Sequence, residues 1–197
     1  MEKKEEQKQE VSVAPLALKK AKIIIKGKTP LLSDRFSEEV QKDILDKQTG
    51  KTKGKKVIRD IKREIERAIH YLPNGKVGFP AQGIIAGMIE STSFCGAKDF
   101  SKKLIRGLKI INTTNGLLEI HFKKQDVLEH RIGNITKFTP QFYDWNMEVI
   151  FEYDENNISI QDLIALINYA GFYYGLGSWS PRCKSGGNFG MYEVEGK

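Results

Sequence analysis

The stretch WNMEVIFEY, residues 145–153, alternates apolar and polar side chains along its whole length. Because successive side chains of a strand point to opposite faces of a sheet, this alternation predicts a long strand with one buried face. The next stretch carries an apolar stripe at helical spacing from Ile160 to Ile167, and Ser159 and Asp162 are spaced as in a capping box. A half-buried strand followed by an amphipathic helix is typical of a sheet with helices packed on one face.

Other segments extend this pattern. The β-branched run at 23–25 predicts a buried strand, and residues 58–72 carry apolar side chains at helical spacing. The turn signal Asn115-Gly116 lies between two β-rich segments, and residues 130–142 are expected to form a protruding hairpin or loop. The predicted fold class is therefore α+β, a two-layer sandwich with helices on one face of a mainly antiparallel sheet. A ferredoxin-like or RRM-like fold is its simplest form.

One domain is expected over residues 19–197, because a chain of this length can bury a core without staples. Residues 1–18 are predicted to be a disordered tail, since MEKKEEQKQE mixes charges and has no apolar signal region. The segment at about 33–56 is predicted to be an inserted, flexible basic flap. Cys95 and Cys183 lie in no CxxC motif and fit a reducing cytoplasm, and no apolar run reaches the roughly 20 residues of a membrane span.

The net charge of +7 favours a polyanionic partner, and nucleic acid is the first candidate. Basic residues gather in two segments, with a net charge of +5 over residues 42–67 and +4 over residues 98–109. Such clusters can neutralise phosphates and make binding depend on salt. The predicted phosphate contacts are Lys53, Lys55, Lys56, Arg59, Lys102, Lys103, Arg106, Arg131 and Lys137.

The C-terminal segment GLGSWSPRCKSGGNFGMYEV places a glycine-rich loop between the last predicted helix, whose expected C-cap is Gly171, and the last strand. Glycines permit positive φ and let backbone N–H groups face an anion. Trp179 offers a ring on which a base can stack. The alternative is a structural loop, with the tryptophan in the core and glycines that only make turns. The loop residues predicted to bind nucleic acid are Gly175, Gly177, Trp179, Arg182, Lys184, Gly186 and Gly187.

The sequence predicts no catalytic set and no cofactor. The histidines are His70, His121 and His130, and no Ser-His-Asp group, Cys-His dyad or metal-spaced cluster stands out. Asp34, in SDRFS, is interpreted as a capping or turn residue. We therefore expect a protein that is not an enzyme.

The final helix, the GLG…GGNFG loop and the last strand resemble the glycine-rich loop of RAMP proteins, which are RNA-binding subunits of CRISPR effector complexes. The segment VGFPAQGIIAGMIES is similar to the turn and helix of RAMP backbone subunits, with Ala81 and Gln82 where a Gly-Ser pair is more usual. The chain also resembles a group of small phage and prophage proteins in TPLLSDRFS, GFPA and the C-terminal motif. The resemblance implies a RAMP-like sandwich, a phage or mobile-element origin with a bacterial host, and protomers that assemble along a strand.

Three functions are consistent with these features. The first is a sequence-tolerant protein that binds single-stranded DNA or RNA, as a homo-oligomer or in a RAMP-like complex. The second is a RAMP-type endoribonuclease that uses Asp34 or His130. The third is a mimic of a RAMP subunit that inhibits a host CRISPR effector complex. We expect the first, because it accounts for the basic clusters and the loop together.

Overall fold

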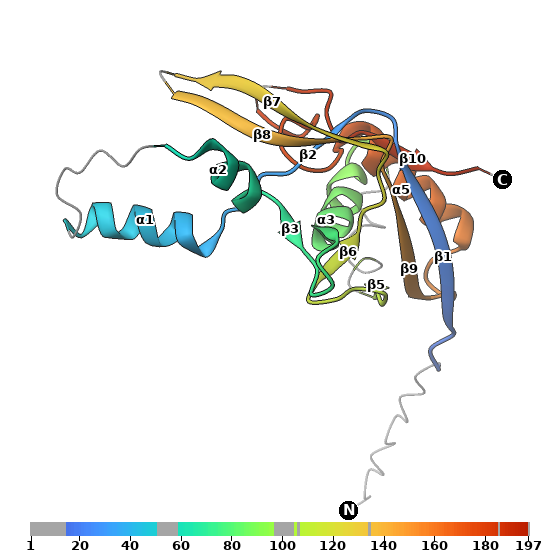
Figure 1. The fold of residues 1–197 in the computed structure, drawn as a ribbon. Coiled ribbons are helices and arrows are strands. Elements are labelled where there is room, and N and C mark those ends of the chain that lie inside the picture. The colour runs from blue at the N-terminus through green and yellow to red at the C-terminus, as the bar shows by residue number, and fades with distance from the viewer. Residues whose placement is uncertain are drawn as a thin grey trace, which may run out of the picture.

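The central feature of the computed structural model is a four-stranded antiparallel sheet (Figure 1). The described residues are 15–50, 59–96, 105, 107–133, 135–184 and 186–196. The strands of this main sheet are β1 (Leu18–Gly27), β5 (Lys109–Ile110), β9 (Asn146–Asp154) and β10 (Tyr192–Val194), in the order β10-β1-β9-β5. The long strand expected from the WNMEVIFEY alternation is confirmed as β9, one of the two central strands.

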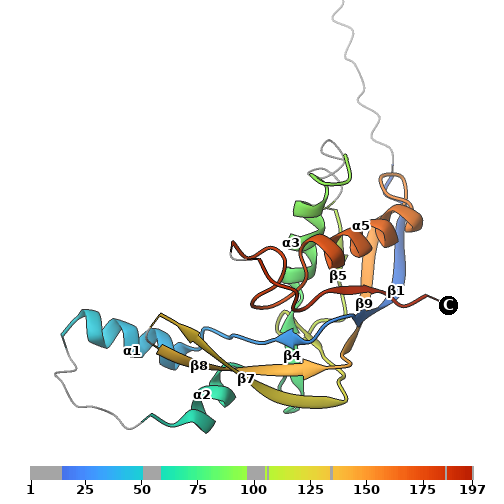
Figure 2. The same cartoon turned by 90° about the horizontal axis from the view of Figure 1, so that it is seen from above.

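Two helices, α3 (Gln82–Ser91) and α5 (Ile160–Tyr173), cover one face of the main sheet (Figure 2). The predicted capping box is present at the start of α5, where the Ser159 hydroxyl accepts from the Asp162 N–H at 3.1 Å. The buried side chains between these helices and the sheet include Ile23, Ile25, Ile84, Met88, Met147, Val149, Phe151, Leu163 and Ile167. The predicted α+β class is thus confirmed.

The chain enters the main sheet in two strand–helix–strand units. The first unit consists of β1, α3 and β5, and the second of β9, α5 and β10. Every neighbouring pair in the sheet is antiparallel. The longest pairing joins β1 to β9, from Leu18 opposite Asp154 to Lys26 opposite Asn146. The two units therefore interleave within one sheet.

A second sheet carries a long hairpin away from the core. Its strands are β2 (Leu31–Leu32), β7 (Lys124–Ile132) and β8 (Ile135–Tyr143), in the order β2-β8-β7. The β7–β8 hairpin extends from the main sheet on the same side as α1 (Glu38–Gln48) and α2 (Ile61–Arg67) (Figures 1 and 2). The predicted protruding hairpin is confirmed, and it is longer than expected because β7 begins at Lys124.

A third sheet is built from β3 (His70–Tyr71), β4 (Val77–Pro80) and β6 (Leu117–Glu119). The predicted turn precedes β6: Asn115 and Gly116 have φ values of 53° and 76°. The strands on either side of this turn join different sheets, since β5 pairs with β9 and β6 pairs with β4. The turn is therefore confirmed, but it does not join a regular two-stranded hairpin.

The flap predicted at about 33–56 is partly wrong, because residues 38–48 form helix α1. The first turn of α1 carries Glu38 and Glu39, and the Ser37 hydroxyl accepts from the Val40 N–H at 3.4 Å. A hydroxyl cap and acidic residues at the N-terminus both stabilise a helix. The part of the predicted flap at 51–56 lies outside the described residues.

The helix predicted at 58–72 is shorter than expected. Helix α2 ends at Arg67, and the two residues of β3 pair with Gly78 and Val77 of β4. The apolar residues at the end of the predicted helix therefore lie beside strand β3 and not on a helix. The helical spacing alone could not reveal that β4 would supply backbone partners.

Gly171 is not the C-cap of α5, because the helix continues to Tyr173. A Cβ on Gly171 would lie 1.9 Å from the carbonyl oxygen of Tyr192. Gly171 therefore lets α5 approach the backbone of β10 directly. Gly175, with φ +60°, follows the end of the helix.

Candidate nucleic-acid interface

The described residues of the C-terminal loop, 175–184 and 186–190, are folded tightly on themselves. A Cβ on Gly187 would lie 1.8 Å from the carbonyl oxygen of Trp179, and a Cβ on Gly190 would lie 1.8 Å from that of Leu176. No side chain fits at either position without moving backbone. The conformation of the loop therefore depends on these two glycines.

The predicted glycines have mainly structural roles. Gly177 has φ +75° and lies against the carbonyl oxygen of Leu32, which a Cβ would approach to 2.2 Å. The N–H of Gly175 donates to the Ala170 carbonyl at 2.9 Å, and the N–H of Gly186 donates to the Cys183 carbonyl at 2.8 Å. These two N–H groups are engaged within the chain, so they are not the free anion-binding donors that the sequence analysis expected.

Trp179 lies at the surface of this loop, with 38% of the residue exposed. Its φ of +56° is unusual for a residue with a side chain. The indole ring contacts His130 of β7 edge to face, with 4.9 Å between ring centroids and an interplanar angle of 71°. The interpretation that Trp179 plugs the core is therefore wrong. The hairpin supports the ring, and the residue remains partly exposed.

His130 is poorly placed for catalysis. Neither of its ring nitrogens is accessible to solvent, and neither has a hydrogen-bond partner among the described residues. A general acid or base must reach the proton that it transfers. The contact with Trp179 gives His130 a packing role in this structure.

Asp34 joins three segments that lie far apart in the sequence. Its carboxylate forms an ion pair with the Lys137 ammonium group of β8 and accepts a hydrogen bond from the Ser178 hydroxyl at 3.5 Å. Lys137 lies opposite His130 in the β7–β8 register, so both side chains point to the same face of the hairpin. The predicted contact Lys137 thus lies beside the loop, but Asp34 neutralises part of its charge.

The predicted basic residues of the loop, Arg182 and Lys184, are both exposed. Burial and the neighbouring Glu90 carboxylate raise the pKa of Tyr174, and the positive charge of Arg182 opposes this rise. Arg182 therefore lies near the end of α5. Arg131 follows His130 on β7, so its side chain points to the opposite face of the hairpin from Trp179.

Arg59 is engaged within the protein. Its guanidinium forms a bidentate ion pair with Glu64, at 2.7 Å for both hydrogen bonds, and lies 5.4 Å from the centre of the Phe138 ring. This ion pair raises the pKa of Arg59. The other predicted basic contacts, Lys53, Lys55, Lys56, Lys102, Lys103 and Arg106, lie outside the described residues.

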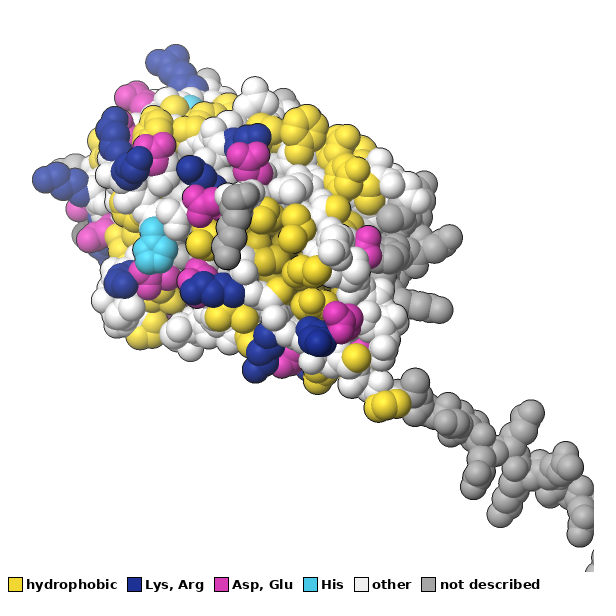
Figure 3. Space-filling view, turned by 90° about the vertical axis from the view of Figure 1, so that its right-hand side faces the viewer, with side chains coloured by type: hydrophobic (Ala, Val, Ile, Leu, Met, Phe, Trp, Pro, Cys, Tyr) yellow, Lys and Arg dark blue, Asp and Glu magenta, His cyan; other side chains and the backbone are white. Residues whose placement is uncertain are grey.

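The open face of the main sheet carries balanced charge. Lys22 pairs with Glu148 at 2.7 Å, and Lys20 lies 4.0 Å from Glu152. In the view of Figure 3, basic and acidic side chains are interspersed with apolar ones, and neither sign dominates. A surface with paired charges attracts phosphates weakly, so this sheet face is a poorer candidate interface than the loop and the hairpin.

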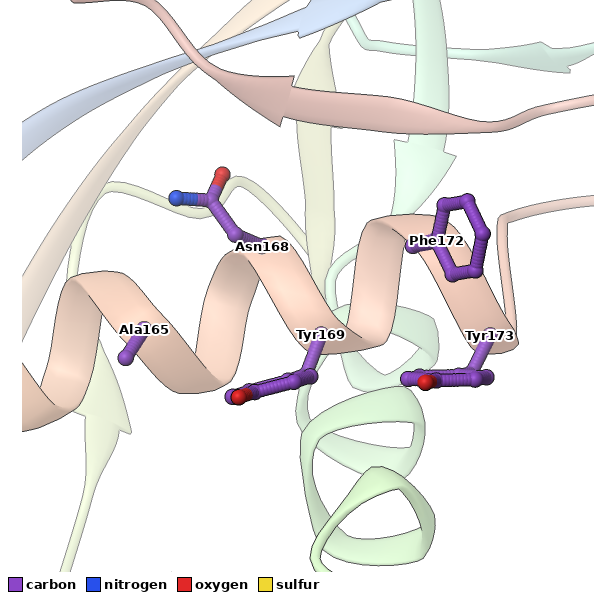
Figure 4. A pocket seen from close by; sticks show the side chains of 5 residues that line it. All are labelled: Ala165, Asn168, Tyr169, Phe172 and Tyr173. Carbon is purple, nitrogen blue, oxygen red and sulfur yellow. The ribbon is translucent and has the colours of Figure 1, made fainter. Parts of the chain in front are cut away.

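An exposed group of aromatic side chains, which was not predicted from the sequence, lies on the helical layer. Tyr169 and Tyr173 lie on α5 with their rings stacked at 6.2 Å, and Phe94 stacks on Tyr173 at 4.9 Å. Figure 4 shows the two tyrosines on one side of α5 and Phe172 on the other. The sequence signal for this group was the motif YAGFYY at residues 169–174. Its aromatic side chains are too close together in the sequence to lie on one buried face of a helix.

Within the part of the chain that the structure describes, no group of three or more His, Cys, Asp or Glu side chains is arranged to hold a metal ion. The helices in the same residues are all too short or too polar to cross a membrane. Comparison with known protein families found no family that matches the chain, and comparison with curated proteins found no match.

Proposed function

We propose that this protein binds single-stranded nucleic acid without strong sequence preference and is not an enzyme. The observation that carries the proposal is Trp179, a partly exposed ring held in a left-handed backbone conformation by a loop that also presents Arg182 and Lys184. A ring face supports a base of any identity, and the neighbouring cations attract the phosphate backbone. The net charge of +7 supports the same partner.

The arrangement of the main sheet supports the further proposal that its core is ferredoxin-like, as in RAMP proteins. Two strand–helix–strand units and the strand order β10-β1-β9-β5 agree with the interleaved topology of that fold. The ligand would not bind on the open sheet face in this proposal, since the charges there are paired. The loop and the β7–β8 hairpin would form the interface instead.

Replacing Arg182 and Lys184 together with alanine is expected to weaken binding of a labelled oligouridylate about tenfold at low salt. Losing two phosphate contacts should also flatten the dependence of log affinity on log salt by about 1.4. Fluorescence anisotropy over a salt series measures both effects. The matched control is Lys20→Ala with Lys22→Ala, which removes the same charge from the open sheet face. Equal losses in the two double variants would show that only net charge matters and would contradict this interface.

RNA cleavage is not expected, with or without magnesium. Asp34 is engaged by Lys137 and Ser178, and the ring nitrogens of His130 are buried. Incubation of purified protein with labelled RNA, followed by denaturing electrophoresis, tests this expectation. Cleavage that disappears in Asp34→Asn, while Asp43→Asn still cleaves, would replace the binding proposal with a nuclease.

A further inference from the structure

A pocket of about 390 Å³ lies where the segment after β2, helices α1 and α2, and strand β8 meet. Pockets that hold small molecules commonly measure roughly 300–1,000 Å³. Its lining includes Asp34, Arg35, Phe36, Arg67, Lys137 and Phe138. Three of the lining side chains are basic and two are aromatic, and the two lining carboxylates, Asp34 and Glu64, are paired with Lys137 and Arg59. This combination suits an anionic ligand with a planar group.

The wall of the pocket is fixed by buried hydrogen bonds. The Ser33 hydroxyl donates to the Ala68 carbonyl at 2.7 Å, and the Arg35 N–H donates to the same oxygen at 3.0 Å. Ser33 is buried, and its own N–H donates to the Pro140 carbonyl at 3.1 Å. The segment that carries Arg35 is therefore tied to both α2 and β8, so the pocket is preformed.

Of the two arginines, Arg35 has unused hydrogen-bonding capacity, whereas Arg67 is engaged. The Nη1 of Arg67 lies 3.4 Å from Glu39 and 3.7 Å from Asp43, and its Nε is buried. Arg35 is exposed and forms no ion pair with a described acidic residue. Guanidinium groups match the geometry of phosphate oxygens well.

The aromatic residues add a second type of contact. Phe36 lines the pocket although 62% of its surface is exposed. A phenylalanine left exposed beside cations is a platform for a nucleobase, as in proteins that bind single strands. Phe138 forms another part of the wall, beneath the Arg59 guanidinium.

The pocket adjoins the loop that carries Trp179. Asp34 lines the pocket, and the same carboxylate accepts from Ser178, the residue before Trp179. One strand can therefore contact both places.

We infer that this pocket takes one nucleotide of a bound strand, with its phosphate on the Arg35 guanidinium and its base on Phe36. This inference rests on the proposed function, and it adds a defined nucleotide subsite to it. A free nucleoside monophosphate could make the same contacts, so the test must distinguish a nucleotide of a bound strand from a free nucleotide.

The test measures binding of labelled oligouridylate by fluorescence anisotropy with Arg35→Gln and Phe36→Ala in the full chain. Each change is expected to weaken binding about tenfold, because each removes one charge-assisted or stacking contact. The matched controls are Arg63→Gln, on the same helix as Arg67 but outside the pocket lining, and Leu45→Ala, an exposed apolar residue of α1. Both controls should bind like the unmodified protein, and thermal melts verify that all variants fold.

A calorimetric titration with uridine monophosphate separates the sources. If the strand binds and Trp179→Ala weakens it, but Arg35→Gln and Phe36→Ala do not, the subsite is overturned and the proposed function stands. If uridine monophosphate binds in an Arg35-dependent way while strands do not bind, the pocket takes a free nucleotide and not a strand. That result would contradict both the inference and the proposed function. If neither ligand binds, both are overturned.

Discussion

Replacing Gly171 with alanine is expected to lower the free energy of unfolding by about 3 kcal/mol. The new Cβ would lie 1.9 Å from the carbonyl oxygen of Tyr192, so α5 and β10 would have to separate. Tyr192 is itself buried, and its side chain belongs to the core cluster between the helices and the main sheet. The strain therefore cannot be relieved by rotating a flexible side chain.

Urea denaturation followed by circular dichroism measures this loss, and two glycines provide controls. Gly87 lies inside α3, where a Cβ would meet Ala170 and Tyr174 at 3.5 Å, an ordinary contact distance. Gly87→Ala should be neutral or stabilising by up to about 1 kcal/mol, since alanine favours a helix. Gly196→Ala should change nothing, because no atom lies within 4 Å. A Gly171→Ala protein as stable as these controls would show that β10 does not pack on α5 as described.

Replacing Trp179 with alanine is expected to weaken strand binding by about 1–3 kcal/mol, or roughly 5- to 150-fold in Kd. The exposed side of Trp179 is the proposed base platform, and its only aromatic partner among the described residues is His130 of β7. Fluorescence anisotropy with oligouridylate and oligothymidylate measures the loss. Similar losses on both strands would agree with stacking, which does not depend on base identity.

Two variants separate stacking from a structural effect of the loop. Trp179→Phe keeps an aromatic ring and should recover part of the affinity, including at temperatures where Trp179→Ala is fully folded, whereas under a purely structural role the affinity of both variants would follow their melting temperatures. Tyr169→Ala removes an exposed ring on α5, away from the loop, and should leave binding unchanged. If Trp179→Ala lowers the melting temperature sharply and strand affinity survives in the folded fraction, the loop is structural and the interface must lie elsewhere.

Features that depend on local periodicity could be predicted from the sequence. The alternation at 145–153 and the capping box at Ser159 and Asp162 located β9 and the start of α5. A strand buried on one face needs a side-chain period of two, and a capping box uses atoms only three residues apart. Such signals are complete within a short segment, so they survive without knowledge of the fold.

Other elements were mispredicted because distant backbone decided them. The helical spacing at 58–72 does not distinguish a longer α2 from a short helix followed by β3, and only pairing with β4 ends the helix. Gly171 resembles a helix cap in sequence, but the approach of β10 explains why it is glycine. The predicted flap is a different case, because the signals that start α1, the Ser37 hydroxyl cap and the acidic first turn, are local and were hidden only by the basic composition of the segment.

In the candidate site, too, some features follow from the sequence and others only from the tertiary structure. The sequence alone determined that a glycine-rich loop near the C-terminus carries Trp179 with two cations, since residue types and their neighbours define that combination. Only the tertiary structure decided that Trp179 rests on His130 and that its neighbour Ser178 reaches Asp34, a residue 144 positions away. The physical reason is close backbone packing: Gly177 lies directly against the carbonyl of Leu32, and no local pattern reveals which distant segment a glycine will admit.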